Sequence, residues 1–213
     1  DLPALTSPTM TKALETFRIV NPAGTQSTDK AVTVPGDATL LVAFTVVAGS
    51  AACANPSFGG VPMKLYFATN LSSATTVNAA IHYLAPFVST SGVQGAQLYT
   101  GSKACAAITS FVFYSGVDAS STFAGNPNWS QSSTPSAHAE LAVPAAQGDA
   151  IAAVLGTRPG SAVALTSPSS FAADHVSEKD TLTAGLATGS AIAARSMALI
   201  SAKVSATSAA GRG

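Results

Sequence analysis

Charged side chains are scarce in this chain. They make up 9% of its 213 residues, with 10 Lys and Arg against 10 Asp and Glu, whereas ordinary soluble domains carry about 25%. Nucleic acids and anionic membrane surfaces are bound through clustered Lys and Arg, and the sequence has no such cluster. The composition therefore predicts no nucleic-acid partner, and a surface coated mainly with hydroxyl and amide groups.

Long apolar runs are also missing. The longest, 39–48 and 150–155, fall short of the roughly 18 to 20 residues that a membrane helix requires, so we expect no membrane insertion. Hydrophobic residues nevertheless make up 47% of the chain. This content, with so little charge, is far from the composition of disordered proteins, and the chain is predicted to fold.

Cysteine is almost absent, with only Cys53 and Cys105. The even count, taken with a non-cytosolic setting, is compatible with one disulfide between them. The alternative is that both are buried free thiols that act as small apolar side chains. Two isolated cysteines lack the companion pair of a zinc site, so we expect no bound metal.

Catalytic motifs are lacking as well. His82 and His138 lie on the polar faces of predicted strands, where we expect them to face solvent. His138 shares its strand face with Glu140, and a predicted loop holds a second group, Asp174, His175 and Glu178. Neither group has the spacing of a metal or acid–base motif. With no nucleophile elbow or phosphate-binding loop either, we expect neither an enzyme nor a cofactor.

Ala, Ser and Thr, which make up nearly half of the chain, are placed with a period of two residues. In 39–46, Leu40, Val42, Phe44 and Val46 alternate with the other residues, which predicts a strand with one core face. Gly59 and Gly60 supply a turn. The remaining predicted strands are 17–20, 30–34, 63–68, 77–84, 94–100, 108–117, 136–143, 149–155, 181–187 and 196–204.

These segments predict an all-β chain. We expect a two-sheet antiparallel β-sandwich of about ten strands, jelly-roll-like or a larger immunoglobulin-like variant, with an N-terminal arm. The sandwich spans 29–206, between an arm or first strand at 1–28 and a C-terminal tail at 207–213. Within the arm, Ser7 to Glu15 could form a helix or stay extended. The arm could complete the sheet of a neighbouring subunit, or form a first strand within its own subunit.

Trp129, the only tryptophan, lies in a polar loop. An aromatic ring among amides could stack on a sugar or anchor an interface, and the alternative is that it covers the end of the core. Asn70 and Asn128 match the acceptor pattern for N-glycosylation, a pattern that also arises by chance in a chain rich in Ser and Thr.

About four fifths of the chain resembles a β-sandwich family found in phage virion proteins and in bacterial surface or secreted proteins. The most specific pieces are the turn Phe58-Gly59-Gly60-Val61, the strand end Tyr114-Ser115-Gly116-Val117-Asp118 and the turn Gln147-Gly148-Asp149 before an apolar strand. The recurring pattern that carries the resemblance consists of LLVAFTVVA at 40–48, PSFGGVPMKLYFAT at 56–69, IHYLAPF at 81–87, ITSFVFYSGVDASSTF at 108–123 and VPAAQGDAIAAVLGTR at 143–158. The resemblance implies a structural or adhesive role in a virion or extracellular setting, and it carries no catalytic residues.

The sequence therefore predicts a non-enzymatic structural subunit of a virion, as a capsid decoration or tail component, or of an extracellular filament. It would assemble with copies of itself or with other shell or fibre proteins, through apolar faces of low charge and strand-edge contacts. The alternative is a secreted or surface module that binds carbohydrate or mediates adhesion, with Trp129 at the glycan contact.

Overall fold

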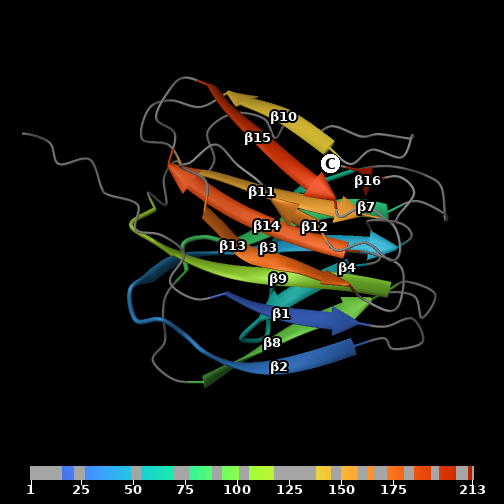
Figure 1. Cartoon of the computed structure of the whole chain (residues 1–213). Coiled ribbons are helices and arrows are strands. Elements are labelled where there is room, and N and C mark those ends of the chain that lie inside the picture. Colours follow the sequence, from blue (N-terminus) through green and yellow to red (C-terminus); the bar gives the residue numbers. More distant parts are fainter. Residues whose placement is uncertain are drawn as a thin grey trace, which may run out of the picture.

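The computed structural model describes thirteen segments of the chain, and side-chain surroundings are given within 19–117. The segments are 16–21, 27–48, 54–69, 77–87, 93–100, 106–117, 138–144, 150–157, 163–165, 172–179, 185–192, 197–204 and 211–212. Every regular element among them is a strand (Figure 1). No helix in these segments has the length and apolar character needed to cross a membrane.

Nine strands lie in the first 117 residues, and seven follow. The first nine are β1 (Thr16–Asn21), β2 (Ser27–Thr33), β3 (Ala38–Ala48), β4 (Ala54–Phe58), β5 (Val61–Pro62), β6 (Lys64–Ala68), β7 (Val77–Leu84), β8 (Val93–Thr100) and β9 (Ala106–Ser115). The others are β10 (His138–Pro144), β11 (Ala150–Thr157), β12 (Val163–Leu165), β13 (Ala172–Lys179), β14 (Gly185–Ile192), β15 (Met197–Val204) and β16 (Gly211–Arg212).

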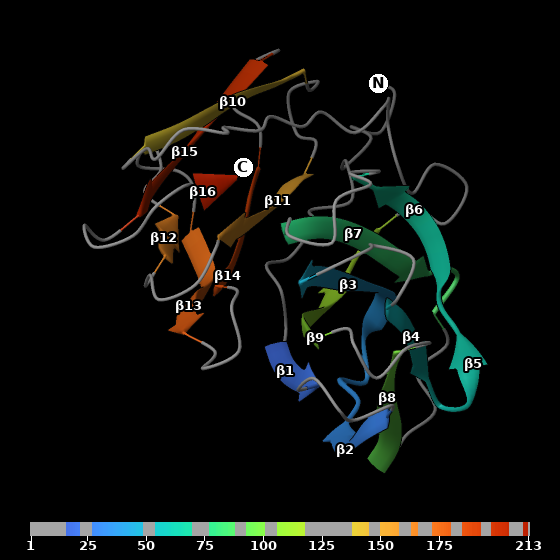
Figure 2. The ribbon, with the colours of Figure 1, turned by 90° about the vertical axis from the view of Figure 1, so that its right-hand side faces the viewer.

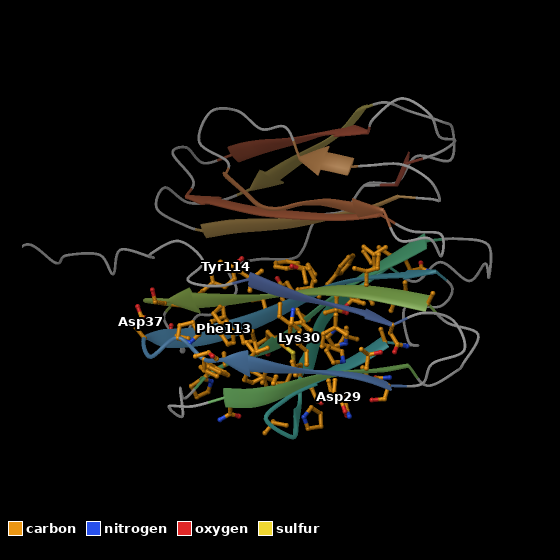
Figure 3. All side chains as sticks on the ribbon, turned by 60° about the horizontal axis from the view of Figure 1, so that its bottom comes forward. Asp29, Lys30, Asp37, Phe113 and Tyr114 are labelled. Carbon is orange, nitrogen blue, oxygen red and sulfur yellow. The ribbon has the colours of Figure 1, made fainter. Side chains whose placement is uncertain are left out.

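The strands pair antiparallel into four sheets, each named here after one of its strands. The β9 sheet has the order β1-β9-β3-β7-β6, and the β8 sheet has the order β2-β8-β4-β5. The β14 sheet has the order β13-β14-β11-β16, and the β15 sheet the order β10-β15-β12. Figure 3 shows them as stacked layers, with the β9 sheet between the β8 sheet and the β14 sheet.

The β9 sheet is covered on both faces, so its central strands are buried throughout. Along β3, Leu41, Ala43 and Val47 pack in one cluster with residues of the β8 sheet. The alternate residues Leu40 and Val42 belong to a second cluster on the opposite face, where β3 and β7 contact strands of the β14 sheet. The sequence predicted only one core face here. The second is core as well, because another sheet covers it.

Three phenylalanines pack against one another between the β9 sheet and the β8 sheet. Phe58 comes from β4, Phe113 from β9, and Phe87 follows β7. The Phe58 ring meets the Phe113 ring edge-on at 5.6 Å between centroids, and the Phe87 ring lies 5.7 Å from Phe58 and 5.6 Å from Phe113. Edge-to-face pairs of this kind add about 0.5 to 1.5 kcal/mol each beyond the area they bury.

The expectation of an all-β antiparallel fold is confirmed for the described residues, and β7 matches its predicted span. The described part nevertheless contains sixteen strands in four sheets, not about ten in two. Five of these strands were not predicted: β4, β5, β12, β13 and β16. Asp174, His175 and Glu178, placed in a loop by the sequence, belong to β13, whose pairing with β14 has two register irregularities that obscure the alternation.

Residues near both ends of the chain belong to strands of these sheets. β1 pairs with β9, and β2 with β8, so 16–21 and 27–28 of the expected arm lie in the chain's own sheets. In the expected C-terminal tail, Gly211 and Arg212 pair with β11. The rest of the arm, including the helix candidate from Ser7 to Glu15, lies outside the described residues.

Candidate functional site

The β9 and β8 sheets end on the same side of the molecule, at β6 and β5. Because Met63 alone separates these two strands, the free edges of both sheets follow one another along the chain, as Figure 2 shows. Within the described residues, β5 pairs only with β4, and β6 only with β7. The segment 61–68 is called the β5–β6 edge below.

A tight turn positions this edge. Gly59 and Gly60 have φ values of +57° and +78°, a region that glycine adopts at little cost. The Gly59 amide donates a hydrogen bond of 2.8 Å to the Gly95 carbonyl, and the Met63 amide donates one of 3.0 Å to the Pro56 carbonyl. The turn predicted from the two glycines is confirmed, and it anchors the start of the edge to the β8 sheet.

The β5–β6 edge exposes large apolar side chains. Val61 is 54% exposed and Leu65 is 59% exposed, and they are the two exposed large hydrophobic residues among the described side chains. Lys64, also exposed, is the only charged residue between 61 and 68. An unpaired edge that is apolar and nearly uncharged is poorly protected against pairing with another chain.

The opposite edge of the β8 sheet is protected by charge. There β2 carries Asp29 and Lys30, both exposed, as Figure 3 shows on the outermost layer. The Asp29 carboxylate accepts a 2.8 Å hydrogen bond from Gln97 Nε2 and a 3.3 Å bond from the Ser27 hydroxyl. Charged residues on an edge strand discourage sheet extension. The β2 edge and the β5–β6 edge therefore differ in the kind of contact they favour.

An irregularity in β6 adds a tyrosine pair beside the edge. The register shifts between Leu65 and Phe67, so Tyr66 is the extra residue of a bulge. The half-buried Tyr66 and Tyr83 rings meet nearly perpendicular, with centroids 6.4 Å apart. Burial raises the pKa of Tyr66. The bulge limits the regular, continuous backbone that β6 can offer to another strand.

His82 is buried, which corrects the expectation that it faces solvent. It is 5% exposed and stands on β7 opposite Ala43 of β3 and Leu65 of β6. Its Nδ1 has no hydrogen-bond partner, and desolvation by burial lowers its pKa to about 4. The alternation along β7 was recognised correctly, but the face interpreted as polar is covered by the β8 sheet.

Other buried polar side chains on the same face satisfy one another. The hydroxyls of Thr45 and Thr109 are 2.8 Å apart. The Thr69 hydroxyl donates a 3.1 Å hydrogen bond to Asn78 Oδ1. The Thr28 hydroxyl of the β8 sheet donates a 2.6 Å hydrogen bond to Asn21 Oδ1 of the β9 sheet. Polar groups paired in this way are satisfied within the protein, as most buried polar groups are. We assign them a structural role.

The remaining predicted histidines lie in separate sheets. His138 and Glu140 lie on β10, where they stand opposite Lys203 and Ser201 of β15. His175 lies on β13, where it stands opposite Thr188 of β14. β10 belongs to the β15 sheet and β13 to the β14 sheet, so these histidines do not share a strand ladder. Among the described residues, no group of three His, Cys, Asp or Glu could hold a metal ion.

Several predicted sites lie outside the described residues. They are the cysteine pair Cys53 and Cys105, the aromatic contact Trp129, and the glycosylation acceptors Asn70 and Asn128. They stay predictions. The β5–β6 edge was missed, although Pro62 was a usable signal: proline cannot donate a ladder hydrogen bond, so within a sheet it favours an edge.

Comparison with known proteins adds no further guide to the site, since no family model, curated protein or solved structure matches the chain.

Proposed function

We propose that this chain is a non-enzymatic structural subunit of a virion or an extracellular filament, and that its β5–β6 edge receives a strand from a second copy. The observation that carries the proposal is the contrast between the β2 edge of the β8 sheet and the β5–β6 edge. β2 is protected by Asp29 and Lys30, whereas Val61 and Leu65 leave the β5–β6 edge apolar and exposed.

The mechanism is strand addition. The outward backbone groups of β6 have no partner strand within the described residues. An added strand would form hydrogen bonds with the β6 backbone groups outside the bulge. Covering Val61 and Leu65, each more than half exposed, would contribute roughly 1 kcal/mol apiece. Lys64 is the only charge on the edge, so little charge has to be desolvated.

We propose residues 1–15 of the neighbouring copy as the added strand, in keeping with the sandwich with an N-terminal arm that the sequence predicts. This segment contains Leu2, Leu5 and Leu14 among polar residues and prolines. A donor strand needs apolar side chains to cover the exposed edge and few charges to desolvate there. The exchange would link copies head to tail, which extends into a filament unless the contacts close into a ring.

Assembly by the full chain tests the proposal. Size-exclusion chromatography with light scattering and electron microscopy should show particles or filaments whose size grows with concentration. Leu65→Lys should shift the chain toward monomer by placing a second charge on the edge. Ala31→Lys, on the exposed face of β2, is the matched control and should assemble normally.

Two further results would count against the proposal. A chain that stays monomeric at every concentration would refute assembly. If removal of residues 1–15 leaves the particles unchanged, the donor segment is wrong, and the edge remains testable through Leu65→Lys alone.

A further inference from the structure

His82 occupies a position beside the free edge of the β9 sheet. On one side of β7 lies β3, whose described side chains are fully or partly buried. On the other side lies β6, which has no further neighbour within the described residues. His82 stands opposite the fully buried Ala43 and the exposed Leu65. The imidazole therefore lies in the core only one strand away from solvent.

Among the described side chains, no buried Asp or Glu is present to balance a positive charge at this position. The described part of the β8 sheet, which covers this face, has one acidic residue, Asp29, which is exposed and accepts hydrogen bonds from Gln97 and Ser27. The strands that pair with or contact β7, namely β3, β6 and β11, contain no Asp or Glu, and neither does β7 itself. Their titratable residues are Lys64, Tyr66 and Tyr83. Lys64 stands opposite Tyr83, whose ring packs with the cluster on the other face of the sheet. The Tyr66 ring contacts Tyr83.

We infer that His82 is an acid-sensitive latch on the β5–β6 edge: the neutral imidazole lets β6 stay paired with β7, and its protonation releases β6 so that the charge reaches water. A buried charge with neither counter-ion nor hydrogen-bond partner at Nδ1 is strongly unfavourable. Displacing β6 removes one partner strand of β7, together with Leu65 opposite His82. Displacing β3 instead would break the fully buried centre of the sheet, so the edge opens first.

The latch regulates the surface that we propose for assembly, and its consequence for assembly rests on that proposed function. The opening of β6 does not depend on the proposed function, because it can be measured on chains that are not assembled. Acid would remove the acceptor edge and so dissociate assembled copies.

Hydrogen exchange of the full-length chain, followed by mass spectrometry and corrected for the intrinsic effect of pH, tests the latch. Burial lowers the pKa of His82 to about 4, so from pH 7 to pH 4.5 the opening equilibrium for β6 should rise roughly 50-fold. Peptides from β3 and β9 should keep their protection. His82→Gln, which cannot be protonated, should abolish the rise in β6.

The controls separate the latch from other effects of acid. His175→Gln removes a histidine from the β14 sheet and should leave the β6 response intact. If His82→Gln does not fold, His82→Leu provides a second neutral replacement. Equal loss of β6 protection in a folded neutral variant would overturn the inference. Simultaneous loss in β3, β6 and β9 of the natural chain would do so as well, because it would indicate global unfolding.

The same measurements keep the two proposals apart. Acid opening of β6 in a chain that never assembles would support the latch and refute the proposed function. Assembly that depends on Leu65, with a β6 that stays closed in acid, would support the proposed function and refute the latch.

Discussion

Leu65 and His82 stand directly opposite each other in the β6–β7 ladder, yet Leu65 is 59% exposed and His82 is 5% exposed. An apolar side chain thus lies in water while its titratable neighbour lies in the core. The β8 sheet covers β7 but leaves the Leu65 side chain on the edge strand uncovered. This one ladder position joins the surface that we propose for assembly to the group that we propose regulates it.

The buried imidazole makes stability depend on pH. The pKa of His82 is about 4 in the folded chain, against an ordinary value of 6.5, so the unfolded chain binds the proton more readily in the window between these values. We expect the free energy of unfolding to fall as the pH drops from 6.5 to 4, by roughly 3 kcal/mol in total.

Urea denaturation at a series of pH values measures this loss. His82→Gln should flatten the profile in this window, whereas His138→Gln should retain it. A slope that survives in His82→Gln would assign the acid sensitivity to other groups.

The three-phenylalanine cluster should dominate the packing between the β9 and β8 sheets. Phe113→Ala removes the ring that contacts both Phe58 and Phe87, and we expect a loss of about 3 to 5 kcal/mol in the free energy of unfolding. Val61→Ala, at an exposed position, should change the free energy by less than about 0.5 kcal/mol. Denaturant melts by circular dichroism compare the two, and a similar cost for both would contradict this packing.

Gly59 is required in the turn before the edge. Its φ is +57°, and an added Cβ would collide with the Gln94 side chain. We expect Gly59→Ala to destabilise the chain by about 1 to 3 kcal/mol, through backbone strain and this contact.

A double-mutant cycle separates the two effects. Adding Gln94→Ala to Gly59→Ala should recover only the part of the lost stability that is due to the collision. Gly36→Ala is the matched control, because a Cβ there meets nothing within 4 Å. A full recovery by Gln94→Ala would show that the backbone angle carries no cost.

The hydroxyl pair between β3 and β9 gives a further test. Thr45→Val leaves the buried Thr109 hydroxyl without its 2.8 Å partner, so we expect a loss of about 1 to 3 kcal/mol. Replacing both residues with valine should recover most of it, since no buried hydroxyl is then unpaired. Thermal or urea unfolding of the two single variants and the double variant gives the coupling energy, and additive losses would mean that the hydroxyls do not interact.

The sequence by itself determined the local structure of much of this chain. Alternation between 77 and 84 predicted β7, because side chains of a strand point to opposite faces whatever covers them. Gly59 and Gly60 predicted their turn, because only glycine takes positive φ without strain. Alanine, serine and threonine in such alternation indicated strands in place of helices, and the described segments contain no helix.

Tertiary structure alone decided which faces became core. Leu41 and Leu40 point to opposite sides of β3 and are both buried, because the β8 sheet covers one side and the β14 sheet lies against the other. His82 is buried for the same reason, although its strand looks half polar. Burial depends on what packs above a face, and small residues such as Ala and Thr suit water and core alike. The same dependence leaves Leu65 exposed, because the sheet that covers His82 leaves the Leu65 side chain uncovered.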